Sequence, residues 1–126
     1  MEFKKDRSYS KSHEWVRELV ADEVEIGISD FAQDALGDIV FVNLPEAGDE
    51  VEIGTPFCDV ESVKAVSDIY SPVDGIVSEV NEELLDNPAQ INEQPFESWL
   101  IRVKKIAKRE ELLSAEEYEA LVKEEA

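Results

Sequence analysis

Lys64 is the residue whose position most strongly suggests chemistry. From Glu18 to Ile101 the chain has 21 acidic residues and one cation, which is Lys64. It lies between two strand-like segments, 57–63 and 66–70, so we expect it near the tip of a hairpin. An exposed lysine lacks the burial or neighbouring cation that a general base or Schiff-base amine needs. We therefore expect Lys64 to be an attachment site, to which an enzyme joins a long group, and not a catalytic lysine.

Two other reactive side chains have simpler interpretations. His13 is the only histidine, so neither a Ser-His-Asp triad nor a histidine-rich metal cluster can be assembled around it, and we expect a structural role. Cys58 is the only cysteine and its nearest charges are acids, which raise the pKa of a thiol, so we expect a core residue. We predict no catalytic residue and no metal site.

The elements that must position Lys64 are mostly strands. Alternation of polar and apolar residues, or a short apolar run bounded by turn residues, predicts strands at 14–20, 23–28, 38–44, 50–53, 57–63, 66–70, 76–80 and 99–103. The run at 38–44 has a continuous apolar centre, so we expect it to be a central strand buried on both faces. The fold class predicted is mainly β.

Helices are expected only as short accessories. Asp30 to Gln33 resembles a capping box, and Gly37 is a natural C-terminal stop, which predicts one or two helical turns between them. Ser114 and Glu117 repeat the capping pattern before an amphipathic tail. We predict a single domain over 1–126, with residues 109–126 forming a C-terminal amphipathic helix.

Composition excludes several partner classes. The 126 residues carry a formal net charge of −19 and a pI near 4.2, so nucleic acid and anionic membrane surfaces would repel the chain. No apolar run is long enough to span a bilayer, and we find no secretory signal. We expect a monomer in the cytoplasm of a bacterium or archaeon, or alternatively in the mitochondrial matrix after removal of a transit peptide.

The residues around Lys64 resemble a known family. The run Val60 to Asp68 (VESVKAVSD) is similar to the lipoyl-lysine site of the H protein of the glycine cleavage system. Four further blocks resemble that family: SHEWV at 12–16, IGISDFAQ at 26–33, LGDIVFV at 36–42 and YSPVDG at 70–75. The resemblance covers roughly residues 9 to 122. The approach to the last strand, 93–99, departs from the family, which commonly has a glycine-bearing stretch there.

The resemblance implies a fold and a function. The fold is a lipoyl/biotinyl-type barrel-sandwich hybrid of two antiparallel sheets. The function is a non-catalytic carrier whose lipoate, in amide linkage to Lys64, accepts an aminomethyl group from glycine. The implied partners are the pyridoxal-phosphate-dependent glycine decarboxylase, the tetrahydrofolate-dependent aminomethyltransferase, dihydrolipoyl dehydrogenase and a lipoate-attaching enzyme.

The resemblance also implies a shelter for the loaded arm. Carried over from the family, the shelter residues are Ser12, Glu14 and Asp68. Two carboxylates and a hydroxyl can make charge-assisted hydrogen bonds to the ammonium at the end of the arm. Glu61 lies beside the tether, where it either helps recognition by the lipoate-attaching enzyme or only keeps the base of the arm soluble.

Two alternatives stay open at this point. One is an H-like protein that mainly stores lipoyl groups for transfer to other enzymes. The other is a structural β-sandwich module whose Lys64 is never modified.

Overall fold

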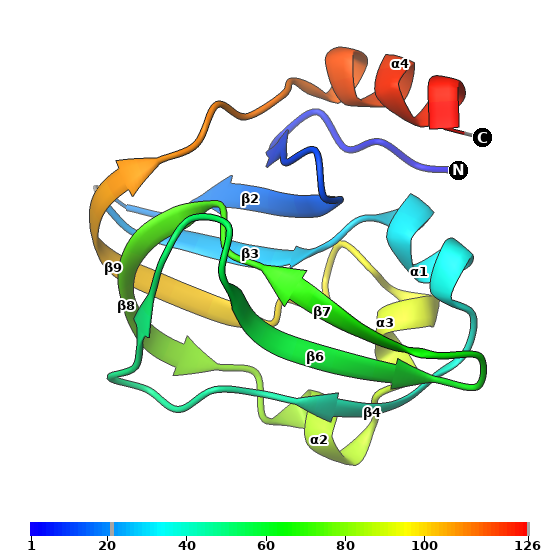
Figure 1. Ribbon diagram of the computed structural model, residues 1–126, viewed down its shortest axis with the longest axis horizontal. Coiled ribbons are helices and arrows are strands. Elements are labelled where there is room, and N and C mark those ends of the chain that lie inside the picture. Colours follow the sequence, from blue (N-terminus) through cyan, green and yellow to red (C-terminus); the bar gives the residue numbers. More distant parts are fainter. Residues whose placement is uncertain (21, 126) are drawn as a thin grey trace.

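The larger of two sheets forms the body of the protein. A computed structural model describes residues 1–20 and 22–125. In this sheet the strands lie in the order β1 (Ser8–Tyr9), β2 (Glu14–Glu18), β3 (Val24–Ile28), β9 (Ile101–Arg109), β8 (Val73–Val80) and β5 (Glu50–Val51). All these neighbours pair antiparallel. The first three strands thus pair in chain order and the third, β3, pairs with the last strand, β9. The two chain ends lie near each other on one side of the molecule (Figure 1).

The smaller sheet carries the Lys64 hairpin. Its strands lie in the order β4 (Ile39–Asn43), β6 (Pro56–Ser62) and β7 (Val66–Tyr70), again antiparallel. It covers one side of the larger sheet (Figure 1). The inward side chains of both sheets form one core, which includes Ile26, Val60, Ile69, Val77 and Val103. The predicted fold class, mainly β with two antiparallel sheets and short helices, is confirmed.

Strand β4 differs from its prediction. It is an edge strand of the smaller sheet and not a central strand. Ile39 and Val42 are buried, but Val40 and Phe41 are 53% and 50% exposed. The register shifts between Ile39 and Phe41, and this irregularity breaks the simple alternation of faces. The expectation of burial on both faces was therefore wrong.

Other strand boundaries differ from the predicted ones, but the order of the strands along the chain is as predicted. The segment predicted at 50–53 is only β5, with an isolated bridge from Ile53 to Ser71 beyond it. The last strand was predicted at 99–103 and in fact continues to Arg109. Strand β8 begins at Val73, earlier than predicted, because it extends along β9. The segment predicted at 66–70 is β7 with unchanged bounds.

Helix α1 (Asp30–Leu36) leads into the edge strand β4. Its N-cap is Ser29, whose hydroxyl accepts a hydrogen bond from the Ala32 N–H, so the cap lies one residue earlier than predicted. The helix ends as predicted at Gly37, whose N–H donates to the Gln33 carbonyl and whose φ is 84°. Two further single-turn helices, α2 (Glu83–Asp86) and α3 (Gln90–Glu93), connect β8 to β9.

The loop at 94–100, which follows α3, is tied at several points. The buried Ser98 hydroxyl donates to the carbonyls of Gln90 and Gln94. The Trp15 indole donates to the Pro95 carbonyl at 3.1 Å, and Arg7 donates to the Phe96 carbonyl at 2.9 Å. These contacts fix the segment that departs from the family pattern.

The C-terminal helix α4 spans Ala115–Glu125, so the predicted span of 109–126 was wrong at its start. Arg109 is the last residue of β9, and Leu113 still bridges to Tyr9. The helix begins where the reciprocal capping box forms, with the Ser114 hydroxyl accepting from the Glu117 N–H and the Glu117 carboxylate accepting from the Ser114 N–H. Residue 126 lies outside the described residues.

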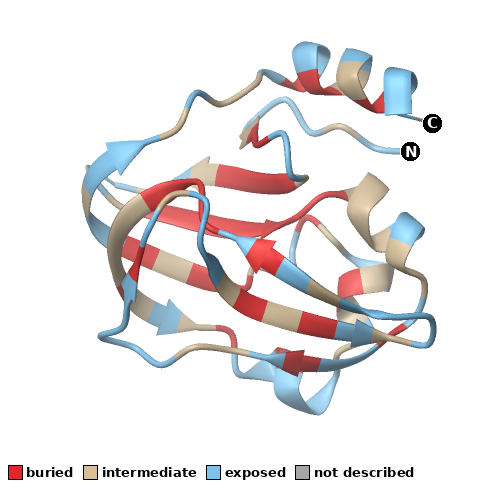
Figure 2. Ribbon diagram, in the orientation of Figure 1, coloured by how far each residue is buried: buried red, intermediate tan, exposed pale blue. Residues whose placement is uncertain are grey.

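An aromatic cluster joins this helix to the sheet. We define it as Tyr9, Trp15, Phe96 and Tyr118, all buried. Tyr9 and Tyr118 stack with ring centroids 4.5 Å apart. Burial is dense along β2 and β3 beneath this cluster, whereas the turn between β6 and β7 is exposed (Figure 2). No helix within 1–20 and 22–125 is long and apolar enough to cross a membrane.

Candidate functional site

Lys64 lies in the turn between β6 and β7, at an outer corner of the molecule (Figure 1). The Ser62 side chain shapes this turn, because its hydroxyl accepts hydrogen bonds from the N–H groups of Lys64 and Ala65, each at 3.1 Å. The Ser62 N–H in turn donates to the Ala65 carbonyl at 2.8 Å. The backbone of the turn is thus satisfied locally, which leaves the Lys64 side chain free of any role in holding it.

The tip is also fastened to the segment that follows α1. The Val63 N–H donates to the Asp38 carbonyl at 3.0 Å. The Lys64 side chain passes over Gly37, where an added Cβ would lie 3.2 Å from the lysine Cε. Glycine at 37 therefore serves two needs, a positive φ and space for the lysine. Sequence reasoning had assigned Gly37 only as a helix stop.

The Lys64 side chain is exposed and makes none of the ion pairs found among residues 1–20 and 22–125. An enzyme that acts on its amine needs neither to unfold the turn nor to break an ion pair.

Glu14 is the buried carboxyl group of the site. It is the first residue of β2 and only 1% exposed. Its Oε1 accepts hydrogen bonds from the hydroxyls of Ser10 and Ser12, both at 2.6 Å. Burial raises the pKa of Glu14 to about 7, and the nearby Glu110 adds to the rise, against the opposing effect of the two serines and the Tyr70 backbone.

Ser10 is a participant that sequence reasoning missed. It is fully buried, and its hydroxyl also accepts from the Glu14 N–H at 2.9 Å. A serine four residues before a glutamate gives no distinctive pattern. Only the turn at 10–13, closed by a hydrogen bond from the His13 N–H to the Ser10 carbonyl, brings the two together.

Asp68 lies on the exposed face of β7. It pairs across the sheet with Asp59, and both line a shallow groove of about 340 Å³ that Ser12 and Glu14 do not line. The link to Glu14 runs along β7, because the backbone of Tyr70, two residues after Asp68, lies near enough to the Glu14 carboxyl to lower its pKa. The structure therefore joins Ser12 to Glu14 directly and places Asp68 on the strand that connects them to Lys64.

His13 and Cys58 have structural surroundings. His13 Nδ1 lies 2.7 Å from the Tyr118 hydroxyl, and its Nε2 lies 3.3 Å from Glu125, so the ring ties the 10–13 turn to α4. Cys58 is buried, and burial raises the pKa of its thiol to about 12, which leaves it protonated and unreactive near neutral pH.

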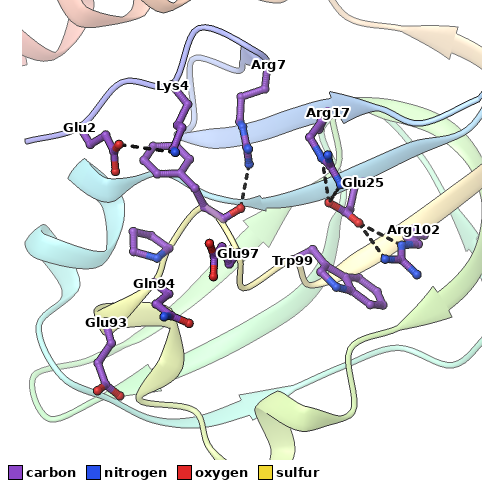
Figure 3. Close-up of a pocket in the computed structure, with 12 residues that line it drawn as sticks. Glu2, Lys4, Arg7, Arg17, Glu25, Glu93, Gln94, Glu97, Trp99 and Arg102 are labelled. Atoms are coloured by element: carbon purple, nitrogen blue, oxygen red, sulfur yellow. Dashed lines mark hydrogen bonds and ion pairs between the residues drawn. The ribbon is translucent and has the colours of Figure 1, made fainter.

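A charged pocket of about 540 Å³ lies elsewhere, between the N-terminal segment, β2, β3 and the 93–99 loop (Figure 3). On one side of it lies the buried Glu25, which pairs with Arg17 and Arg102 at 3.0 Å each. The Arg102 guanidinium lies 4.0 Å from the centre of the Trp99 ring. Lys64 and the three predicted shelter residues do not line this pocket. The charges of Glu25, Arg17 and Arg102 on this side already pair with one another.

Comparison with known proteins gives the family. A model of the family described as "Glycine cleavage H-protein" matches residues 7–125. The chain belongs to the glycine cleavage H-protein family. Members of this family are lipoyl carriers of the glycine cleavage system, and this chain has that function.

Individual members are similar over nearly their whole length. The glycine cleavage system H protein of Halalkalibacterium halodurans is 58% identical over 120 residues, which covers 93% of each chain. That of Lachnoclostridium phytofermentans is 56% identical over 117 residues, covering 93% of this chain and 92% of the other. The crystal structure of a glycine cleavage system H protein from Mycobacterium marinum superposes with a TM-score of 0.88 at 40% identity, covering 95% of this chain and 98% of that one.

Proposed function

We propose that Lys64 carries the lipoate as an N6-lipoyllysine. The observation that carries this proposal is an exposed amine, without an ion pair among the described residues, on a turn whose backbone is fixed by Ser62 and Asp38. Such a site fits the group, because the side chain is accessible while its base stays in place. When bound, lipoate supplies a dithiolane that accepts the aminomethyl group of glycine and is later reoxidised from the dithiol.

Attachment needs chemistry that the turn permits. The lysine amine, once deprotonated, attacks the carbonyl carbon of an activated lipoyl group. An amide bond forms, the bond between that carbon and the activating group breaks, and the amine loses a further proton to solvent. The positive charge of Lys64 disappears, so no cation then remains between Glu18 and Ile101.

The length of the arm matches the spacing along β7. Lysine plus lipoyl forms a chain of about a dozen bonds that spans roughly 10 to 15 Å. Asp68 is four residues beyond Lys64, across the end of the turn and the start of β7, so the two are at most about 13 Å apart at a rise of about 3.3 Å per residue. An arm folded back along β7 therefore reaches Asp68 and approaches the Tyr70 backbone, which lies near the Glu14 carboxyl.

Ser12, Glu14 and Asp68 form the proposed shelter. The cargo on the arm ends in an amine that is cationic near neutral pH, and carboxylates stabilise it through charge-assisted hydrogen bonds. With its pKa raised to about 7, Glu14 is partly protonated when free, and an arriving ammonium favours the ionised form. Ser12 holds the carboxyl group in position through its 2.6 Å hydrogen bond.

The proposed partners are those that the chemistry requires. They are the glycine decarboxylase that loads the arm, the aminomethyltransferase that unloads it, the dihydrolipoyl dehydrogenase that reoxidises it and the enzyme that attaches lipoate. The chain itself is proposed to be non-catalytic: Cys58 is protonated and His13 is bound to α4. The cytoplasmic location and monomeric state stay predictions.

Reconstitution with glycine decarboxylase tests the attachment site. We expect lipoylated wild-type protein to support exchange of labelled bicarbonate into the glycine carboxyl group, and Lys64→Arg to support none. The Lys104→Arg variant is the matched control, since Lys104 is an exposed lysine on β9. Exchange by Lys64→Arg at the wild-type rate would rule out Lys64.

Release from the loaded arm tests the shelter. We expect Glu14→Gln and Asp68→Asn each to speed the loss of formaldehyde and ammonia from the loaded protein by about tenfold, the effect of one charge-assisted hydrogen bond. Glu52→Gln, which neutralises an exposed carboxylate in the loop after β5, serves as control. Release that is unchanged in both variants would contradict the shelter while leaving Lys64 as the attachment site.

A further inference from the structure

An exposed apolar face surrounds the Lys64 turn. Eight large hydrophobic side chains are exposed in the described part of the chain, and five of them belong to β4 and the β6–β7 hairpin. One of the five, Tyr70, lies at the end of β7 away from the turn, and the other four lie near the turn. We call these four the tip face. They are between 50% and 66% exposed: Val40, Phe41, Val63 and Val66. Apolar residues gathered on one surface in this way mark an interaction site more often than scattered ones do.

Strand register places two members of the tip face in one row. Phe41 pairs with Glu61, and Glu61 pairs with Val66, so the three side chains cross the smaller sheet on the same side. Val63 stands in the turn itself, next to Lys64. Within the hairpin, Glu61 lies two residues before Val63 and Val66 directly follows Ala65. The row therefore lies beside the turn.

The tip face continues into a groove. Phe41 lines a groove of about 770 Å³ between β4 and α2, together with Leu85, which is 52% exposed. Four acidic residues also line this groove: Glu46, Glu79, Glu82 and Glu83. With Glu61 in the middle of the row, the surface is apolar with an acidic rim, and a partner with an apolar surface and basic rim is its complement.

The reach of the two forms of Lys64 identifies the occupant. An unmodified lysine side chain extends about 6 Å from its Cα, whereas the lipoylated side chain spans roughly 10 to 15 Å. An enzyme that acylates the bare amine must therefore bring its active site against the turn, and its surface must cover residues next to Lys64. Enzymes that act on the end of the arm can work at a distance from the same residues.

We propose that the tip face is the docking surface for the enzyme that attaches lipoate to Lys64, and that this enzyme meets it with an apolar patch edged by basic side chains. This inference rests on the proposed function of Lys64. It gives Glu61 a role in recognition, because Glu61 lies between the two apolar side chains that the enzyme covers.

Rates of acylation test the proposal. The probe is a purified lipoate–protein ligase with lipoate and ATP, and the product is followed by intact mass. We expect the combined variant Phe41→Thr/Val63→Thr/Val66→Thr to lower kcat/KM for acylation by about tenfold or more, the loss typical of a central apolar contact. Threonine keeps the strand preference of these positions. Val20→Thr, at a residue 67% exposed, is the control and should change kcat/KM less than twofold, within about 0.4 kcal/mol.

Two further readouts separate docking from other effects. Wild-type kcat/KM should fall as salt is added, and Glu61→Gln should weaken that dependence. The combined variant, once fully lipoylated at high ligase concentration, should be reoxidised by dihydrolipoyl dehydrogenase within twofold of the wild-type rate, because the arm reaches beyond the tip face. Thermal melting checks that the variant is folded, and Val63→Thr alone is the fallback if it is not.

The outcomes are distinguishable. Failure of the ligase to acylate even the wild-type protein would overturn the proposed function of Lys64 itself. Normal acylation of wild-type and variant alike would overturn only the docking surface. Equal losses with ligase and dehydrogenase, or a wild-type dimer that the variant dissociates, would show that the face serves another partner or a second copy, and would also overturn it.

Discussion

The hairpin turn that carries Lys64 and the aromatic cluster under α4 hold their key residues in opposite ways. At the turn, backbone hydrogen bonds through Ser62 and Asp38 fix the main chain and leave the lysine side chain free. In the cluster, the side chains themselves make the contacts. Tyr118 stacks on Tyr9 and is hydrogen-bonded to His13. The proposed lipoyl attachment therefore uses a side chain that contributes little to stability, and stability depends on side chains that take no direct part in that attachment.

Tyr118→Ala should produce the largest effect on stability and sharpen this comparison. The variant removes a fully buried ring and the partner of Ser29 and His13, so we expect a loss of about 3 to 5 kcal/mol, or on the order of 10 °C in Tm. Lys64→Arg should shift Tm by less than about 2 °C, because an exposed tip residue contributes little packing. Calorimetry on both variants makes the measurement.

A reversal of these two results would break the comparison. A large loss of stability in Lys64→Arg would mean that the lysine holds the turn. Tyr118→Phe provides a finer control, because it keeps the ring and removes only the hydroxyl, for an expected cost of about 1 to 3 kcal/mol.

The sequence was sufficient to predict the turn and insufficient to predict its surroundings. The bounds of β7 and the position of Lys64 follow from local signals, namely alternation and turn residues. The outward face of β4 could not be read from its apolar run, because a register shift near Val40 decides which side chains point outward. The start of α4 was visible in the Ser114 capping box but not in the broader span from 109.

The site was predicted in the same uneven way. Exposure of Lys64 follows from its place in a hairpin. The burial of Glu14 does not, since its environment is assembled from Ser10, the Tyr70 backbone on another sheet and Glu110 near the other end of the chain. Contacts between segments so distant in sequence leave no periodic signal in either one.

Glu14 provides the second prediction, which concerns pH. Its pKa is about 7 in the folded protein against 4.5 ordinarily, so between these values the folded state holds a proton that the unfolded state has lost. The contribution of Glu14 to stability is therefore complete below about pH 4.5, falls as pH rises to about 7 and stays low above it. The total change is about 3 kcal/mol.

Urea unfolding of wild-type and Glu14→Gln at pH 5 and pH 8 measures this change. From pH 5 to pH 8, we expect the difference in unfolding free energy to move in favour of Glu14→Gln by about 2 to 3 kcal/mol, since glutamine does not titrate. A difference that stays constant over this range would show that Glu14 is ionised throughout, as an exposed carboxylate would be.

Gly37 provides the smallest expected effect and the closest control. Gly37 and Gly48 both have positive φ, but an added Cβ meets Lys64 only at Gly37 and meets nothing within 4 Å at Gly48. Alanine at either position should cost about 1 kcal/mol in backbone strain. Only Gly37→Ala should also change the rate of Lys64 acylation, by about twofold to fivefold, or up to about 1 kcal/mol. Ligase kinetics on the two variants separate strain from contact, and equal acylation rates would show that the contact is incidental.

Mass spectrometry of the protein from a lipoate-replete host with an active ligase tests the central claim most directly. We predict that wild-type protein gains the mass of one lipoyl group in amide linkage, that peptide fragmentation places it on Lys64, and that Lys64→Arg gains nothing. Wild-type protein that stays unmodified under these conditions, or a lipoyl group found on another lysine, would contradict the account.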